Sequence, residues 1–281
     1  MIRSLDWRSL VRNGNGTAGL IFVAGVVLTA VLAGAIAPYP PTMMNLESTF
    51  AGPEFGHILG SDEFGRDVLS RVIDGARASL AIGVSAVVIG MVLGGLPALF
   101  AGYLGGVVDL IFTRIVDIFM AIPALLVALG ILALVGPSGP TVALAIAIAY
   151  APTFARVIRS AVSSARVQAY VEASVGMGAS TFRVLMTEIL PNVLPIVIVQ
   201  ATSAIAWAIL DEANLGFLGV GVQPPNASWG SLLIEGRQYF FQAPWLPIGA
   251  GLAVLIAVLG FNLLGDALRD VLDPRAWQRE I

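Results

Sequence analysis

Two stretches of the sequence are free of charged residues and are each about as long as a membrane-crossing helix. They cover residues 17–37 and 78–101. A helix needs roughly 20 apolar residues to cross the hydrocarbon core of a bilayer. Over all 281 residues, 57% are hydrophobic and only 12% are charged, which lies well outside the range of soluble domains. These stretches therefore predict an integral membrane protein.

Four further apolar stretches extend this prediction to an all-α protein with six transmembrane helices. They cover residues 118–135, 141–155, 189–210 and 246–264. An even number of spans puts both ends of the chain on one side. The expected layout is an N-terminal segment 1–16, a first span 17–37, an outer segment 38–77, a core 78–275 and a tail 276–281.

The arginines orient these spans. All 15 basic residues are arginine, and with the N-terminus inside only four of them lie in outer segments: Arg66, Arg71, Arg77 and Arg237. The positive-inside rule therefore predicts that both termini and residues 156–188 are cytoplasmic. The first span also resembles a signal peptide that ends at residues 35–37, but its apolar run is too long, so we expect it to be retained.

The outer segment 38–77 contains glycines that permit turns and charges that can pair with each other, among them Asp62, Arg66 and Asp67. A self-satisfied loop and a contact with a partner protein are both compatible with this pattern. His57 is the only histidine and the chain has no cysteine. We therefore expect no metal site, because one histidine cannot build one alone.

The predicted cytoplasmic segment 156–188 carries six charges, yet keeps apolar residues at helical spacing. Gly178 tolerates backbone angles that other residues avoid, and Ser180 is a good helix N-cap. This pattern predicts two short helices that meet at an elbow. An amphipathic helix resting on the membrane surface fits the same periodicity.

The order Glu172-Ala173-Ser174, then Gly178, then Leu190-Pro191 resembles the EAA signature of ABC importer permeases. Two positions depart from that signature. Ser174 replaces an alanine, and Glu188 occupies a position that is usually apolar.

Three more blocks look like the dipeptide, oligopeptide and nickel branch of these permeases. They read HILGSDEFGRDVLSRVIDGARASL at residues 57–80, FLGVGVQPPNASWG at 217–230 and FNLLGDALRDVLDPR at 261–275. With the EAA-like segment, the resemblance covers residues 57 to 275. It implies a type I ABC importer permease fold in the cell membrane, an extracytoplasmic substrate and a subunit that is not itself catalytic.

In that family the EAA segment is a coupling helix that docks on a cytoplasmic ATPase. The resemblance transfers this docking role to Tyr170, Glu172, Ala173, Ser174, Gly178, Ala179 and Arg183. It also implies a second permease subunit, two ATPase subunits that bind ATP and magnesium, an extracytoplasmic solute-binding protein and membrane lipid. The chain itself has no phosphate-binding GxxxxGK[ST] loop, so we expect it to bind no cofactor, and no nucleic acid.

Two outer groups are weaker candidates. Asp211 and Glu212 end the fifth span, where acids are costly unless they face protein, water or substrate, so they are candidates for the translocation pathway. Pro224, Pro225 and Trp229 suit either an interfacial anchor or a contact with the binding protein. At the other end of the last span, Asp266 and Arg269 can form a local ion pair or a second ATPase contact.

Two other classes of function compete with the importer interpretation. An ion-driven secondary transporter usually carries ionisable residues midway along its spans, where the predicted spans have none. A scaffold or an intramembrane enzyme has no support, because no paired catalytic aspartates, HExxH motif or serine–histidine arrangement appears in them. The substrate stays open between dipeptides, longer peptides, nickel chelates and haem-like cargo.

Overall fold

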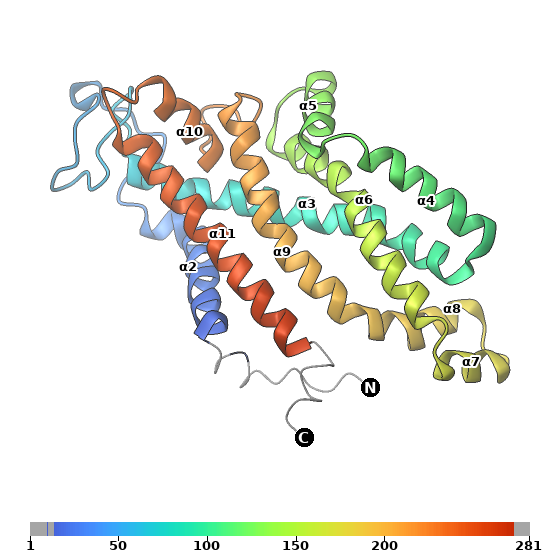
Figure 1. Ribbon diagram of the computed structural model, residues 1–281. Coiled ribbons are helices and arrows are strands. Elements are labelled where there is room, and N and C mark those ends of the chain that lie inside the picture. The colour runs from blue at the N-terminus through green and yellow to red at the C-terminus, as the bar shows by residue number, and fades with distance from the viewer. Residues whose placement is uncertain (1–9, 11–13, 273–281) are drawn as a thin grey trace.

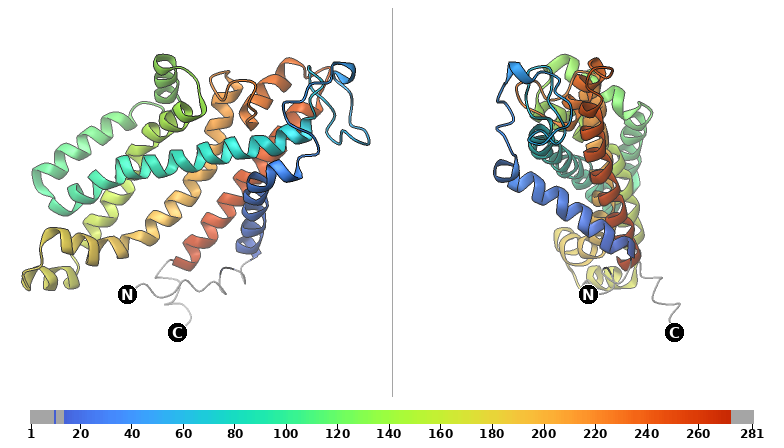
Figure 2. Two further views of the ribbon diagram at one scale, coloured as in Figure 1. Left: turned by 180° about the vertical axis from the view of Figure 1, so that it is seen from behind. Right: turned by 90° about the vertical axis from the view of Figure 1, so that its left-hand side faces the viewer.

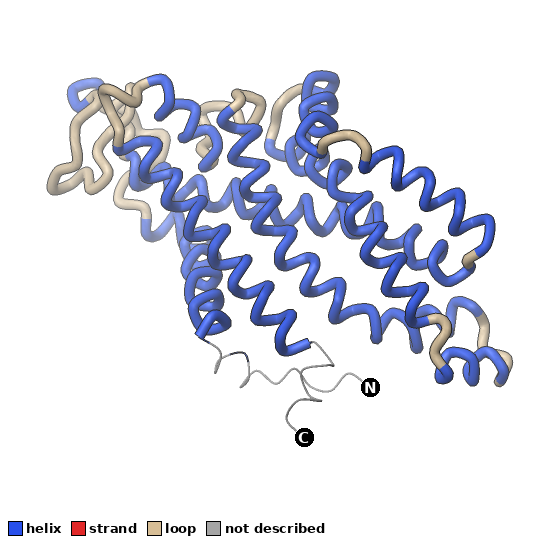
Figure 3. The backbone as a smooth tube through the Cα atoms, viewed as in Figure 1, coloured by secondary structure: helices blue, strands red, loops and turns tan. Residues whose placement is uncertain are grey.

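The computed structural model describes residue 10 and residues 14–272; residues 1–9, 11–13 and 273–281 lie outside the description. Within the described part the chain consists of helices and loops (Figure 3). Five continuous helical stretches are long and apolar enough to cross a membrane. They are α2 (Gly14–Ile36), α3 (Val68–Leu104), α6 (Gly139–Ala165), Thr181–Phe217, which includes α9 (Leu190–Phe217), and α11 (Trp245–Leu272).

The remaining span is broken. Helices α4 (Gly106–Met120) and α5 (Ala124–Val135) pass the same test together but are bent by 81°. The predicted span 118–135 was therefore wrong, since it straddles the bend. Pro123 directly precedes α5, and proline lacks the N–H that a continuous helix would need there. The fold has up to six spans if the bent pair counts as one.

Several other boundaries differ from the prediction. Helix α6 continues to Ala165 and α11 to Leu272, so both run past the predicted ends of their spans, and residues 156–165 of the predicted cytoplasmic segment belong to a helix. Helix α3 begins at Val68, so the charged residues between 68 and 77 belong to a helix and not to a loop. The fifth span also begins early: α8 (Thr181–Val184), a π-helical segment η2 (Leu185–Ile189) and α9 follow one another without a break. The second helix of the predicted elbow is thus the first turn of a span.

The helices have two distinct ends (Figures 1 and 2). One end, called the loop end below, holds residues 37–67 with the short helix η1 (Leu46–Ser48), and also α10 (Trp229–Gln238). The other, called the α7 end, holds α7 (Ala169–Gly176) and α8. The first residues of α2 and the last of α11 also point toward the α7 end.

The main core lies where α3 crosses α6. Its buried side chains include Ile82, Ile146, Phe154 and Val162. The backbones approach closely because small residues face each other: a Cβ added at Gly94 would lie 1.9 Å from the carbonyl oxygen of Ala151. Small residues of this kind let helices pack tightly in lipid. A second, smaller core joins α2, α9 and α11.

Candidate functional site

The elbow at the α7 end follows the sequence prediction in its local geometry. Helix α7 ends at Gly176, and Gly178 has a φ of +84°. The side chain of Ser180 then accepts a hydrogen bond from the backbone N–H of Arg183 at 3.4 Å, so it caps α8 as expected. A left-handed residue followed by a capping serine turns the chain sharply between the two helices.

One face of α7 holds it against the membrane helices. Val171 is buried in a cluster with Val184, Leu185 and Ile189, and Ser174 is also buried. The other face is open. Of the remaining residues assigned to docking, Ala179 is half-buried and five are exposed: Tyr170, Glu172, Ala173, Gly178 and Arg183.

Apolar side chains next to these residues are exposed as well, namely Val167, Val175, Met177 and Phe182. Glu188, the second departure from the signature, is half-buried in the π-helical segment. Its Oε1 accepts a hydrogen bond from the Thr187 hydroxyl at 3.3 Å. Loss of water raises the pKa of Tyr170, and the carboxylate of Glu188 raises it further. The α7 end is therefore a mixed apolar and polar surface on a fixed support.

At the loop end, a buried network of charges joins three elements. Asp62 Oδ2 accepts hydrogen bonds from Arg66 Nε and from Arg71 Nη1, both at 2.6 Å. Arg71 also donates to both carboxylate oxygens of Glu235 in α10, at 2.5 and 3.0 Å. The pairing of Asp62 with Arg66 was expected from the sequence. The roles of Arg71 and Glu235 were missed, since nothing in the sequence links positions 164 residues apart.

The expected partner Asp67 binds elsewhere. Its carboxylate accepts hydrogen bonds from the backbone and hydroxyl of Ser70, at 2.8 and 2.6 Å, and lies 2.8 Å from His57 Nδ1. The His57 ring also stacks on Tyr39, with ring centroids 4.9 Å apart. The single histidine therefore fixes the loop through an acid and an aromatic ring.

Carboxylate oxygens of Asp62, Glu63 and Glu235 lie within 4.8 Å of one another, which is close enough for a metal ion. The Arg71 guanidinium already occupies that space beside two of them, and its charge would repel a second cation. Glu63 keeps one buried oxygen without a partner. Burial raises its pKa, and the charges of Glu235 and Asp62 add to this effect. The group is better explained as an ionic network than as a metal site.

Trp229 lies inside the protein. Its side chain is only 2% exposed, and its indole N–H donates to the carbonyl oxygen of Val72 at 3.0 Å. Gly75 makes room for it, because a Cβ there would lie 3.3 Å from the indole ring. The predicted interfacial anchor is therefore wrong. In this conformation the side chain also offers no surface to a partner protein.

The two acids of the fifth span contact protein groups. Glu212 is fully buried and accepts a hydrogen bond from the Ser79 hydroxyl at 2.7 Å, and the same hydroxyl accepts the backbone N–H of Trp229. Asp211 accepts a hydrogen bond from the Tyr150 hydroxyl at 2.6 Å. These contacts tie α9 to α3, α10 and α6. Neither acid lines the two cavities described next.

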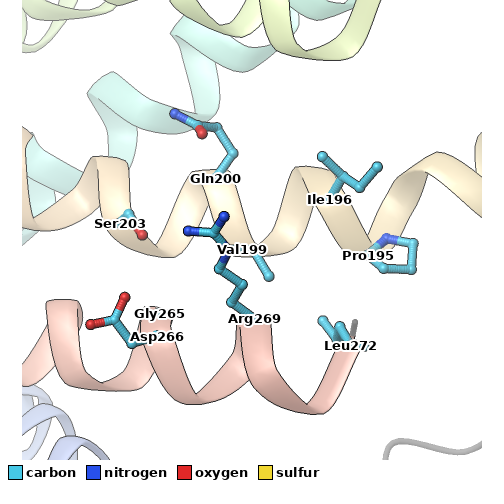
Figure 4. Close-up of a pocket in the computed structure, with 9 residues that line it drawn as sticks. All are labelled: Pro195, Ile196, Val199, Gln200, Ser203, Gly265, Asp266, Arg269 and Leu272. Atoms are coloured by element: carbon cyan, nitrogen blue, oxygen red, sulfur yellow. The ribbon is translucent and has the colours of Figure 1, made fainter. Parts of the chain in front are cut away.

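A cavity of about 480 Å³ lies between α9 and α11 near the α7 end (Figure 4). It is lined by Pro195, Ile196, Val199, Gln200, Ser203, Gly265, Asp266, Arg269 and Leu272. Asp266 and Arg269 are separated in Figure 4, and no ion pair joins them, contrary to the local pair expected from the sequence. A second cavity, of about 380 Å³, lies at the loop end beside Glu63, Pro224 and Glu235.

A third group of charges, on α4 and α6, was not recognised as a site in the sequence. Arg159 donates to both oxygens of Asp109 at 2.5 Å, and Arg156 donates to Asp117 at 3.0 Å. The predicted boundaries hid this pattern, because they left Asp109 and Asp117 outside any span. The observed helix α4 includes both acids.

This architecture of spans, a protruding short helix at one end and buried ionic contacts at the other defines a multi-pass helical membrane protein. The family described as the binding-protein-dependent transport system inner membrane component matches residues 86–278, and the N-terminal TM domain of oligopeptide transport permease C matches residues 5–53. The chain belongs to this family of inner-membrane permease subunits of ABC importers, within its dipeptide and oligopeptide branch.

Individual relatives are similar over almost their full length. The chain is 42% identical to the Di/tripeptide transport system permease protein DppC of Pseudomonas aeruginosa over 275 residues, covering 96% of this chain and 91% of the relative. It is 43% identical to the Dipeptide transport system permease protein DppC of Escherichia coli over 278 residues, covering 97% and 93%.

Solved structures confirm the fold. A chain of the inward-facing MetNI methionine ABC transporter superposes with a TM-score of 0.58. The match covers 71% of this chain and 95% of that chain at 22% sequence identity. The expected type I importer permease fold is therefore confirmed.

Proposed function

We propose that this subunit forms half of a peptide translocation pathway and is driven by an ATPase that docks on α7. The observation that carries the proposal is the exposed face of α7 on a buried support. Helix α7 follows α6 after only three residues and precedes the continuous helix from Thr181 to Phe217. A push on α7 would therefore reach two spans directly, as alternating access requires.

The surface of α7 suits a protein partner. Glu172 and Arg183 are exposed and form no ion pair with the described residues, so each is available for a charge-assisted hydrogen bond. Small Ala173 and Gly178 permit close approach. Exposed Met177 and Phe182 offer the apolar contact that protein interfaces favour. Tyr170 adds an aromatic group, while Ser174 and Ala179 support the turn.

The arginine distribution supports a cytoplasmic position for the α7 end. The loop end would then face the solute-binding protein. Pro224 lines the loop-end cavity, and Pro224 and Pro225 are both exposed, so this turn is our proposed contact. Trp229 would position it from within. The fifth-span acids Asp211 and Glu212, first considered as pathway residues, would instead hold α9 in place.

The substrate class rests on the relatives, whose names specify dipeptide or di/tripeptide transport. We infer that this chain passes short peptides. ATP and magnesium would bind to two partner ATPase subunits, and a second, related permease would complete the pathway.

A charge reversal tests the docking surface. We expect Glu172→Lys to reduce copurification of the ATPase by about tenfold, since loss of a charged hydrogen bond at an interface costs on the order of 1.5 kcal/mol. Glu54→Lys is the matched control, because Glu54 is an exposed acid within the 37–67 segment of the loop end. Equal ATPase recovery with wild type, Glu172→Lys and Glu54→Lys would contradict the proposal.

A further inference from the structure

Helix α4 carries a row of polar side chains that faces α6. Asp109, Thr113 and Asp117 are spaced four residues apart, so they lie along one face of the helix. Arg159 binds Asp109 with two hydrogen bonds of 2.5 Å, and Arg156 binds Asp117 at 3.0 Å. Two antiparallel helices of the membrane region are thus joined by two ion pairs.

The second of these ion pairs, between Arg156 and Asp117, is exposed at the surface of the subunit. The Arg156 and Asp117 side chains are 55% and 44% exposed. Arg156 lies nine residues before the end of α6, which is about 14 Å along the helix axis. Charges at this position cannot face lipid hydrocarbon without a large cost, so this face must meet water or protein.

The opposite side of α4 differs in chemistry. Val108, Ile115 and Phe119 are all exposed and fall together on the helical wheel, away from the row of acids. This apolar side is suited to lipid. The helix is therefore amphipathic within the membrane region, and only Val116 is fully buried by the rest of the described chain.

The break after α4 supports contact with water on the polar side. Residues 121–123, at the bend of 81°, are exposed. Non-helical backbone in a membrane protein is tolerated where it is buried in protein or lines a water-filled cavity. Broken helices of this kind contribute to substrate routes in transporters.

Arg114 adds a charge that no described residue compensates. It is exposed on α4 and forms no hydrogen bond or ion pair with residue 10 or with residues 14–272. Together with Arg156 and Arg159 it gives three positive charges against the two acids of the row. The surplus charge favours an anionic ligand, and a guanidinium group binds a carboxylate with two parallel hydrogen bonds.

We propose that the polar face of α4 and α6 lines the translocation pathway and that Arg114 binds the terminal carboxylate of a passing peptide. This inference rests on the proposed peptide transport for the ligand, but not for the water-lined face. The neighbouring Asp117–Arg156 pair would keep the face hydrated and polar between substrates.

The absence of cysteine from the chain allows a direct test. Arg114→Cys and the control Ile115→Cys are each introduced into the complete complex in lipid nanodiscs. A negatively charged methanethiosulfonate reagent then modifies the thiol, which must ionise in water to react. We expect rapid modification of this chain at position 114. At position 115 we expect a rate at least about tenfold lower, because a thiol that faces lipid forms little of the reactive thiolate.

The result that would overturn the proposal is slow modification at position 114 in the complex. If position 114 reacts only when the second permease is absent, the face is a subunit interface. Equal slow rates at 114 and 115 would mean lipid on both sides. None of these readings depends on the identity of the substrate.

Transport by the full complex tests the carboxylate. We expect Arg114→Gln to lower uptake of a dipeptide with a free carboxylate by about tenfold, the usual effect of losing one charged hydrogen bond, with Arg114→Lys in between. ATPase copurification should stay at the wild-type level in both. Unchanged uptake with rapid labelling at 114 would disprove the carboxylate contact and leave the water-lined face standing. Absence of peptide uptake by the wild type would instead reject the proposed substrate.

Discussion

Arg71 of α3 and Glu235 of α10 form a two-pronged ion pair at 2.5 and 3.0 Å, although 164 positions separate them in the sequence. The Arg71 side chain is almost fully buried, and it also binds Asp62. The pair therefore fastens α10 and the 37–67 loop to the same helix. It fixes the loop end, where we propose that the solute-binding protein docks.

Removal of the Glu235 carboxylate should show how much this ion pair contributes to the stability of the folded protein. Glu235→Ala leaves the buried Arg71 with only Asp62 as an acidic partner, and breaking a buried pair typically costs about 3–5 kcal/mol. Thermal unfolding of the detergent-purified protein should show a clear drop in Tm. Asp74→Ala is the control, since the Asp74–Arg77 pair is exposed and 3.8 Å long and should contribute less than about 1 kcal/mol. Equal Tm shifts for the two variants would disprove the role of the buried pair.

The Glu63 carboxyl predicts a dependence of stability on pH. Burial raises its pKa in the folded protein, so the folded state binds more protons than the unfolded state above the ordinary value of 4.5. Stability should therefore fall as the pH rises through the folded pKa. Glu63→Gln should lose this pH dependence of stability. Its Tm should exceed that of the wild type near pH 8, and the difference in Tm should shrink toward pH 4. The measurement is Tm from pH 4 to 8, and parallel curves for the two proteins would refute the assignment.

The buried side chain of Trp229 should contribute strongly to the stability of the fold. Trp229→Ala removes a buried ring and its hydrogen bond to Val72, and truncations of this kind cost about 3–5 kcal/mol. Trp207→Ala is matched in chemistry, but the Trp207 side chain is 58% exposed, so its effect should be small. Thermal unfolding of both variants distinguishes them. A larger loss for Trp207→Ala would mean that Trp229 is not the internal anchor.

Gly94 allows the close packing of α3 against α6, and a larger residue at this position should disrupt it. An added Cβ would lie 1.9 Å from the carbonyl oxygen of Ala151, so Gly94→Ala must push two packed helices apart. Overpacking usually costs about 1–3 kcal/mol. Gly130→Ala, where a Cβ would meet nothing within 4 Å, should be neutral or slightly stabilising because alanine favours helix. Equal stability of the two variants would show that the helices separate freely.

The sequence predicted the parts of the fold that depend on local composition. Uncharged runs identified the spans, and Gly178 with Ser180 identified the elbow because their preferences act within a few residues. The bend between α4 and α5 was missed, since hydropathy averages across Pro123. The burial of Trp229 was missed too, because an aromatic residue after a turn with two prolines suits a membrane interface and a packed interior equally well. Only tertiary contact with Gly75 and Val72 distinguishes them.

The candidate site residues also divide into those set by local sequence and those set by contacts between distant segments. The docking surface of α7 lies within one segment, so the sequence could present it as a unit. The rows of charge on α4 and α6, and the link from Arg71 to Glu235, arise from helix pairing. They emerge only when distant segments are placed side by side.

The most direct test of the account is ATP-dependent uptake of a labelled dipeptide by the complete complex in proteoliposomes, with ATP hydrolysis measured in the same sample. We predict that Glu172→Lys and Gly178→Pro lose uptake together with ATPase association, while Gly130→Ala retains both. Normal, ATP-coupled uptake by both α7 variants, once their insertion and assembly are verified, would contradict the claim that α7 is the coupling element.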